Sequence, residues 1–248
     1  MDPEYAAAYP ALYRHHWWWR TREQILLRKI RQILAGVERP RMLDVGCGAA
    51  LFFDALEPFG HVEGVESDAA AVGQSGKWRS RIVVGELDDA YRPSAPFDLI
   101  LLLDVLEHTR VPEQLLRQAA RHLTATGRIL VTVPAFQWLW TAHDDLNHHV
   151  ARYTADEMRR IFSRADLVAV ETRYMFQSLV LAKLLVRGRE ALTSSVARVP
   201  TIPPAALNRA TQAWFTVEDA LAGRLPFGAS VVAVAAPRRS NRETGTGP

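Results

Sequence analysis

Cysteine is nearly absent from this chain of 248 residues, which contains a single one, Cys47. One cysteine excludes an internal disulfide framework and any zinc site built from several cysteines, and it fits a reducing compartment. Long apolar runs are also missing, since none approaches the about 20 residues that a membrane-spanning helix needs. The first ten residues lack the basic start and apolar core of a signal peptide. We therefore expect a soluble, cytoplasmic protein.

A strong excess of charge of either sign is lacking as well. The 30 basic and 27 acidic side chains leave a net charge of +3, and residues 238–248, with three arginines and one glutamate, hold +2 of it. Nucleic-acid affinity depends on clustered Lys and Arg that neutralise phosphates. The nearly neutral body of the chain therefore argues against a nucleic-acid partner.

Short apolar runs alternate with helical patterns between residues 41 and 134. Strands that alternate with helices predict a parallel sheet covered by helices on both faces. Residues 99–103 are apolar without polar alternation, as is typical of a central strand buried on both faces. The expected strands are residues 42–45, 61–66, 81–84, 97–103 and 128–133, and the expected helices between them are residues 50–59, 68–74 and 112–123.

After residue 134 the pattern changes to a loop rich in aromatic residues and histidines, residues 135–152. Thr154 and Glu157 form a capping box that opens a further helix. Two more strands are expected at residues 166–176 and 229–236, and an unusually long connection separates them.

The most informative segment is the glycine turn at residues 43–48, Leu-Asp-Val-Gly-Cys-Gly. Glycines at a strand-to-helix turn let the backbone approach a ligand closely. Glu66 follows at the end of the next expected strand, where an acid accepts hydrogen bonds from ribose hydroxyls. Together with a third strand that ends in Val84-Gly85-Glu86, these features predict a site for a nucleoside-bearing cofactor.

Two positions argue against a dinucleotide in that site. Leu51 stands where a Gly-x-Gly-x-x-Gly motif has its third glycine, and the charge of Asp44 would oppose a pyrophosphate. A nicotinamide oxidoreductase is therefore disfavoured. A ligand with an ammonium group is favoured, and S-adenosylmethionine carries that group and a sulfonium. Asp44 and Glu66 match its amino-acid and ribose ends.

These residues resemble a known family. Residues 43–48 look like the first motif of class I S-adenosylmethionine-dependent methyltransferases, and residues 104–108, Asp-Val-Leu-Glu-His, are similar to the VLEH signature of the subgroup with ubiquinone-biosynthesis O-methyltransferases. Residues 125–130 resemble the turn into the family's fifth strand, although Ala-Thr-Gly replaces the commoner Pro-Gly-Gly. The resemblance covers residues 40–175 and extends to the closing strand near Val231.

The resemblance implies an α/β, Rossmann-like seven-stranded sheet with its last strand antiparallel, helices on both faces and a helical insert between the last two strands. It also implies a set of cofactor-binding residues. These are Asp44, Gly46 and Gly48 beside the methionine part, Glu66 at the ribose, Glu86 and Leu87 beside the adenine, and the backbone of Leu103 at the methionine ammonium. Ala49 and Ala50 stand where another glycine is common, which can tighten the pocket, and Cys47 is expected to be a small filler.

Three consecutive indoles, Trp17 to Trp19, precede the sheet and lead into an expected helix at residues 23–34. They cannot all face one side of a helix, so at least one contacts another element or a ligand. In one interpretation this segment is a lid over the cofactor, and Arg20 or Arg22 binds the cofactor's carboxylate. In the other, the indoles pack on the sheet and the arginines are solvated.

Residues 138–153 follow the fifth expected strand, at the sheet edge where α/β proteins bind their ligands. His143 and His148 are the preferred candidates for a general base that acts on the methyl acceptor, since an imidazole titrates near neutral pH. His108, the last residue of the VLEH signature, is a third candidate.

Two other interpretations of this segment are possible from the sequence. Histidines and aspartates suit a transition metal, but the adjacent His148 and His149 point different ways and no helical i, i+4 pair of histidines is present, so we expect no metal. The structural alternative is that His149, Arg152 and Tyr153 tie the loop to the next helix.

Residues 177–227 are more apolar than a solvated cover needs to be. They are interpreted as a helical cap that packs on the sheet or on a second copy of the chain, as in a homodimer. The alternative is an apolar substrate channel or a peripheral contact with a bilayer. In such a contact, Lys183, Arg187 and Arg189 would lie near anionic headgroups.

The expected organisation is an N-terminal helical lid (residues 1–40), a cofactor-binding core (41–176), the helical insert (177–227), the closing strand (228–237) and a disordered tail (238–248). The expected function is transfer of a methyl group from S-adenosylmethionine to an oxygen, nitrogen or carbon nucleophile of a small-molecule or lipid-like acceptor. The alternative function is a non-catalytic cofactor-binding module of the same fold.

Overall fold

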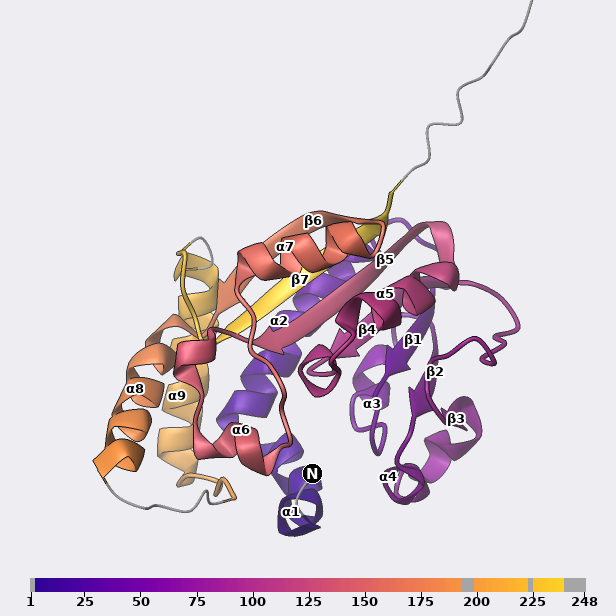
Figure 1. The fold of residues 1–248 in the computed structure, drawn as a ribbon. Coiled ribbons are helices and arrows are strands. Elements are labelled where there is room, and N and C mark those ends of the chain that lie inside the picture. The colour runs from indigo at the N-terminus through magenta and orange to yellow at the C-terminus, as the bar shows by residue number, and fades with distance from the viewer. Residues whose placement is uncertain (1–2, 193–198, 223–224, 239–248) are drawn as a thin grey trace, which may run out of the picture.

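The computed structural model describes residues 3–192, 199–222 and 225–238. These residues form a seven-stranded sheet with the order β3-β2-β1-β4-β5-β7-β6 (Figure 1). β7 is antiparallel to both β5 and β6, while the pairs among β1 to β5 are parallel. The strands are β1 (Arg41–Val45), β2 (His61–Glu66), β3 (Ile82–Val84), β4 (Phe97–Leu103), β5 (Leu123–Pro134), β6 (Leu167–Met175) and β7 (Ser230–Pro237). The expected fold is confirmed.

Helices of the described residues precede these strands and separate them. The α-helices are α1 (Pro3–His15), α2 (Trp17–Ile33), α3 (Phe53–Leu56), α4 (Ala69–Gly73), α5 (Pro112–Arg121), α6 (Ala142–Leu146), α7 (Ala155–Arg164), α8 (Gln177–Leu192) and α9 (Ala205–Ala222). Short 3-10 helices are η1 (Gly76–Arg81), η2 (Leu106–His108) and η3 (Gln137–Leu139).

The sheet buries two apolar layers, one on each face. Ile100 and Leu102 of β4 belong to the layer covered by α5 and α7 (Figure 1). Leu99 and Leu101 belong to the opposite layer, which includes side chains of α2, α3 and α9. All four are fully buried because β4 lies between β1 and β5. The apolar run at residues 99–103 therefore predicted the position of this strand correctly.

Two of the expected boundaries were wrong near the sheet. The helix expected at residues 50–59 is limited to α3, because Ala50 has a φ of +56° and continues the turn that follows β1. The helix expected at residues 112–123 ends at Arg121, since the chain already pairs with β4 from Leu123 onward.

The helix expected from residue 23 begins six residues earlier, at Trp17. The side chain of His16 accepts a hydrogen bond from the Trp18 amide at 3.1 Å and caps this helix. The loop expected at residues 135–152 also contains the short helix α6, which starts with a capping box of Thr141 and Asp144.

Helix α9 packs on α2, although the two are far apart in the sequence. The side-chain amide of Asn208 accepts a hydrogen bond from the Trp17 amide at 2.8 Å and donates one to the carbonyl of His15 at 2.7 Å. The Trp17 ring stacks on Phe215 with ring centroids 4.8 Å apart. These contacts join the start of the chain to the helices between β6 and β7.

The boundaries given for the lid, the core and the insert stay proposals. Of the tail expected to be disordered, only Arg238 lies within the described residues. Within the described part of the chain, no helix is both long and apolar enough to cross a membrane.

Candidate active site

The carboxyl end of β1 carries the glycine turn, and two of its glycines have left-handed backbone angles. Gly46 has a φ of +73° and Gly48 a φ of +54°. A Cβ on Gly46 would lie 2.8 Å from the Cγ2 of Val105, so this position has no room for a side chain. A Cβ on Gly48 would meet nothing within 4 Å, which leaves the backbone there open to a ligand.

Glu66, at the end of β2, holds this turn in place. One of its carboxylate oxygens accepts a hydrogen bond from the Gly48 amide at 2.8 Å, and the other accepts one from the Asp68 amide at 2.8 Å. The side chain is half-buried. Each carboxylate oxygen can accept more than one hydrogen bond, so Glu66 keeps acceptor capacity for a ligand.

Two further carboxylates lie at the same edge of the sheet. Asp44 is buried in β1, and burial raises its pKa to about 7, while Arg22 acts in the opposite direction. Asp104 follows β4 with a φ of +58° and pairs with Arg22 at 2.8 Å. Its second oxygen accepts a hydrogen bond from the Thr132 hydroxyl at 3.0 Å. Arg22 thus neutralises Asp104, whereas a positively charged ligand beside Asp44 would favour the ionised form of that buried carboxyl group.

The remaining predicted cofactor residues lie at the ends of β3 and β4. Gly85 has a φ of +153°, and a Cβ there would meet nothing within 4 Å. Glu86 is exposed, Leu87 is 6% exposed, and Leu103 is half-buried at the end of β4. Cys47 lies beneath the turn, where a Cβ on Gly64 would meet its sulfur at 2.5 Å.

The two arginines proposed to bind the cofactor have different partners in the structure. Arg20 pairs with Glu23, three residues along the same helix. Arg22 reaches the sheet edge, where it contacts Asp104 and donates a hydrogen bond to the Thr132 hydroxyl at 2.8 Å. Of the two, Arg22 is therefore the one positioned beside the glycine turn.

The three indoles have different partners. Trp17 stacks on Phe215, as described above. Trp18 lies 6.1 Å from Phe176 between ring centroids, and Trp19 packs edge-on against Tyr9 of α1 at 5.9 Å. The indoles thus join α2 to three separate elements, and the lid remains a prediction.

The three predicted catalytic histidines have different environments. His143 of α6 is half-buried, and its ring packs edge-on against Tyr5 of α1 at 5.6 Å. Burial lowers the pKa of His143 to about 4, which makes it a weak base. His148 is exposed with a φ of +56°. His108 is exposed in η2 and lies four residues after Asp104 in the sequence.

A buried ion pair organises the loop after β5, and it involves His149 and Arg152, two of the three residues named in the structural alternative. Asp144 is fully buried and receives two hydrogen bonds from the Arg152 guanidinium, both at 2.9 Å, and one from His149 Nδ1 at 2.9 Å. Burial alone would raise the pKa of Asp144, but the bonds from His149 and Arg152 hold it well below its usual range. The Tyr153 hydroxyl donates to the carbonyl of Leu106 at 2.9 Å.

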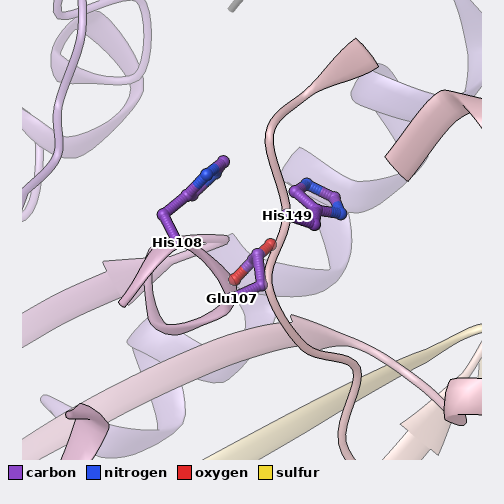
Figure 2. A group of neighbouring side chains, drawn as sticks. All are labelled: Glu107, His108 and His149. Atoms are coloured by element: carbon purple, nitrogen blue, oxygen red, sulfur yellow. The ribbon is translucent and has the colours of Figure 1, made fainter. Parts of the chain in front are cut away.

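The same loop brings His149 against the VLEH signature. His149 lies beside Glu107 and His108 of η2 (Figure 2), and one possible ligand atom from each of the three lies within 4.8 Å of the others. Glu107 is 1% exposed, and burial, together with Asp104, raises its pKa well above its usual range. The VLEH signature marked the position of Glu107, but sequence reasoning gave it no role.

Three features together define the class I S-adenosylmethionine-dependent methyltransferase fold. The first strand of the sheet ends in a glycine turn, an acid on the second strand fixes this turn, and the closing strand is antiparallel. The model of a family described as "Methyltransferase domain" matches residues 18–172. The chain belongs to this family, which confirms the resemblance at residues 43–48 and 104–108.

Two curated relatives are both named ubiquinone biosynthesis O-methyltransferase. The one from Alkalilimnicola ehrlichii is 30% identical over 112 residues, which cover 41% of this chain and 44% of the relative. The one from Aromatoleum aromaticum is 25% identical over 130 residues, which cover 46% of this chain and 56% of the relative. The chain thus spans about half the length of the curated relatives it matches.

Solved structures support the fold. An S-adenosylmethionine-dependent methyltransferase from Clostridium acetobutylicum matches with a TM-score of 0.57 at 9% identity, covering 88% of this chain and 91% of that chain. The magnesium protoporphyrin IX methyltransferase of Synechocystis, solved with bound SAH, matches with a TM-score of 0.52 at 12% identity, covering 88% and 84%.

The residues at the sheet edge fit the predicted cofactor, S-adenosylmethionine. The open backbone at Gly48 and Gly85 leaves room for a ligand at two strand ends. The fixed carboxylate of Glu66 suits the hydroxyls of a ribose. The buried carboxyl group of Asp44 suits a positively charged group of the cofactor, which would favour its ionised form. The chemistry of this donor set supports S-adenosylmethionine as the cofactor.

Proposed function

We propose that this protein is an enzyme that transfers a methyl group from S-adenosylmethionine to a hydroxyl oxygen of a small-molecule or lipid-like acceptor. The observation that carries the proposal is the Glu66 carboxylate, fixed by the Gly48 amide beside an open glycine backbone. The names of the two curated relatives favour oxygen among the oxygen, nitrogen and carbon nucleophiles that the sequence left open.

The cofactor would be held by residues at the ends of four strands. Glu66 would accept hydrogen bonds from its ribose, Leu87 would contact its adenine, and Asp44 and the Leu103 backbone would lie at its methionine end. When bound, S-adenosylmethionine supplies a methyl group on a positively charged sulfur, and the electron pair of the broken C–S bond stays on that sulfur. The protein's main task is then to hold the acceptor in line, which contributes up to about 7–11 kcal/mol.

The acceptor hydroxyl must also lose its proton as its oxygen bonds to the methyl carbon. We assign this task to the η2 turn, because Glu107 and His108 directly follow the end of β4, where Asp104 lies. A group that takes up the proton would add about 10²–10⁴-fold in rate. His143 is less suited, since its ring packs against Tyr5 and its pKa is lowered to about 4.

Helices α8 and α9 support a lipid-like acceptor. Figure 1 shows them side by side beyond the end of β6. Both expose large apolar side chains, and Leu185 is 77% and Leu221 81% exposed. Arg187 and Arg189 add positive charge to α8. We infer that these helices contact a bilayer surface from which the acceptor is taken.

Calorimetry with S-adenosylhomocysteine tests the cofactor site. Loss of a hydrogen bond to a charged group costs about 1.5–3 kcal/mol, so Glu66→Ala is expected to raise the Kd about 10–150-fold. Glu57→Ala, at an exposed acid after α3, is the matched control and is expected to leave the Kd unchanged. Equal affinity in wild type and Glu66→Ala would reject the assigned site.

The reaction itself is tested with labelled S-adenosylmethionine and the lipid, small-molecule, protein and RNA fractions of a cell extract. We expect label as an O-methyl group in the lipid or small-molecule fraction. A chain that binds the cofactor but labels no fraction would be a binding module, and label in RNA would contradict the argument from charge.

A further inference from the structure

Glu107, His108 and His149 come from two segments of the chain that meet beside the end of β4. Glu107 and His108 belong to η2, and His149 lies in the loop between α6 and α7 (Figure 2). We propose that these three side chains bind one divalent transition-metal ion. The expectation of no metal concerned the histidines and aspartates of residues 138–153, whereas two of these ligands come from outside that segment.

The first observation is a buried carboxylate oxygen with nothing to bond to. Within the described residues, Glu107 Oε2 is buried and has no hydrogen-bond partner. A buried acceptor left unsatisfied costs about 1–3 kcal/mol, and more when it carries charge. A cation between Glu107 and the two imidazoles would supply the missing partner.

The second observation is the orientation of His149. Its Nδ1 is hydrogen-bonded to Asp144 Oδ1 at 2.9 Å. A proton on Nδ1 leaves the lone pair of Nε2 free to bind a metal. A carboxylate behind a ligating histidine is the usual arrangement in metal sites, where it fixes the ring and its tautomer. Asp144 is itself fixed by Arg152, so this support is rigid.

The third observation is the spacing of the possible ligand atoms. The rings of His108 and His149 lie edge-on with centroids 5.0 Å apart, and the ligand atoms of the three residues lie within 4.8 Å of one another. Metal–nitrogen and metal–oxygen bonds of about 2.0–2.2 Å place the ligand atoms of a tetrahedral ion about 3.3–3.6 Å from each other. The three side chains must therefore close on the ion by about 1 Å. His108 is exposed, so its ring has space to turn, although it must exchange its contact with the His148 backbone for the ion.

The ligand set indicates the class of metal. Two imidazoles and one carboxylate suit Mn²⁺, Fe²⁺, Co²⁺ or Zn²⁺ rather than Ca²⁺ or Mg²⁺, which prefer oxygen ligands. Three protein ligands leave open positions on the ion. If the proposed function holds, the acceptor hydroxyl takes one of them. The η2 turn then acts through the ion, which lowers the pKa of the hydroxyl so that the proton passes to solvent water rather than to Glu107 or His108.

A titration with Co²⁺ tests the site, using the full chain freed of metal with a chelator and without S-adenosylmethionine. Wild type is expected to bind one equivalent and to develop the visible ligand-field bands of histidine-bound Co²⁺. His149→Ala and the isosteric Glu107→Gln are each expected to raise the Kd at least about tenfold, since even supporting residues of metal sites cost 10–100-fold. His61→Ala, at an exposed histidine on β2, is the matched control and should bind like wild type.

Absence of saturable one-to-one Co²⁺ binding by wild type would overturn the proposal, and so would unchanged binding in both folded variants. Circular dichroism establishes that the variants are folded. The outcome is separate from that of the proposed function. A chain that binds Co²⁺ but not S-adenosylhomocysteine would support the metal site and reject the proposed methyltransferase function. A chain that binds S-adenosylhomocysteine but not Co²⁺ would reject the metal site alone.

Discussion

Replacement of Arg152 by alanine is expected to destabilise the fold by about 3–5 kcal/mol, because removal of one partner of a buried ion pair leaves an uncompensated buried charge. Asp144 is fully buried, and Arg152 is 5% exposed. Arg152 makes two hydrogen bonds to Asp144 and a third, from Nη1, to the Ala135 carbonyl at 2.9 Å. Alanine removes all three, whereas the hydrogen bonds of Asp144 with His149 and with the backbone and hydroxyl of Thr141 remain.

Thermal unfolding followed by circular dichroism measures the effect. For a chain of this size, 1 kcal/mol corresponds to about 2–4 °C in Tm, so Arg152→Ala is expected to lower the Tm by roughly 6–20 °C. Arg159→Ala is the matched control, because Arg159 forms an exposed ion pair with Asp156 within α7, and such a pair contributes about 0–1 kcal/mol. If Arg152→Ala lowers the Tm no more than Arg159→Ala, the argument that this buried pair organises the loop is refuted.

Two further predictions concern pH and membranes. Burial lowers the pKa of His143 to about 4 from an ordinary value of about 6.5, so unfolding takes up a proton and the free energy of unfolding falls as the pH drops between these values. Urea titrations at about pH 7.5 and about pH 5 measure this free energy. It should fall less between the two pH values for His143→Gln than for wild type, and an equal fall would contradict this assignment. Leu185→Asp and Leu221→Asp are expected to reduce sedimentation with anionic phosphatidylglycerol vesicles several-fold, whereas Val111→Asp, at a position 55% exposed, should not. A wild-type dimer that these variants dissociate, with no binding to vesicles, would instead make α8 and α9 a dimer interface.

The sheet could be predicted from the sequence because each signal for it is local. The apolar run at residues 99–103 has a length and composition that are typical of a central strand buried on both faces. Glu66 follows Gly48 by 18 residues, which is the length of one turn, one helix and one strand, and the structure joins the two by a hydrogen bond. Patterns of this kind depend on residues close together in the sequence, so they can be recognised without knowledge of the fold.

The side chains that meet across the site could not be predicted in the same way. Glu107 and His149 are 42 residues apart, and their contact depends on the path of the loop after β5. The sequence alone did not decide whether Arg20 or Arg22 reaches the cofactor. One signal was present, because Glu23 lies three residues after Arg20 and can hold the Arg20 side chain in a local ion pair. The short α3 was also beyond prediction, since the left-handed backbone of Ala50 carries no distinctive residue type.

The contact between α2 and α9 has a mechanical consequence. Asn208 bonds to both sides of the α1–α2 junction, and the Arg28 guanidinium pairs with Asp219 of α9 at 2.8 Å. Arg22 of α2 meanwhile reaches Asp104 at the mouth of the glycine turn. A movement of α2 away from Asp104 must therefore take α9 with it or break these bonds. The position of Arg22 at the sheet edge is thus mechanically coupled to the helix that exposes Leu221 on the outer surface.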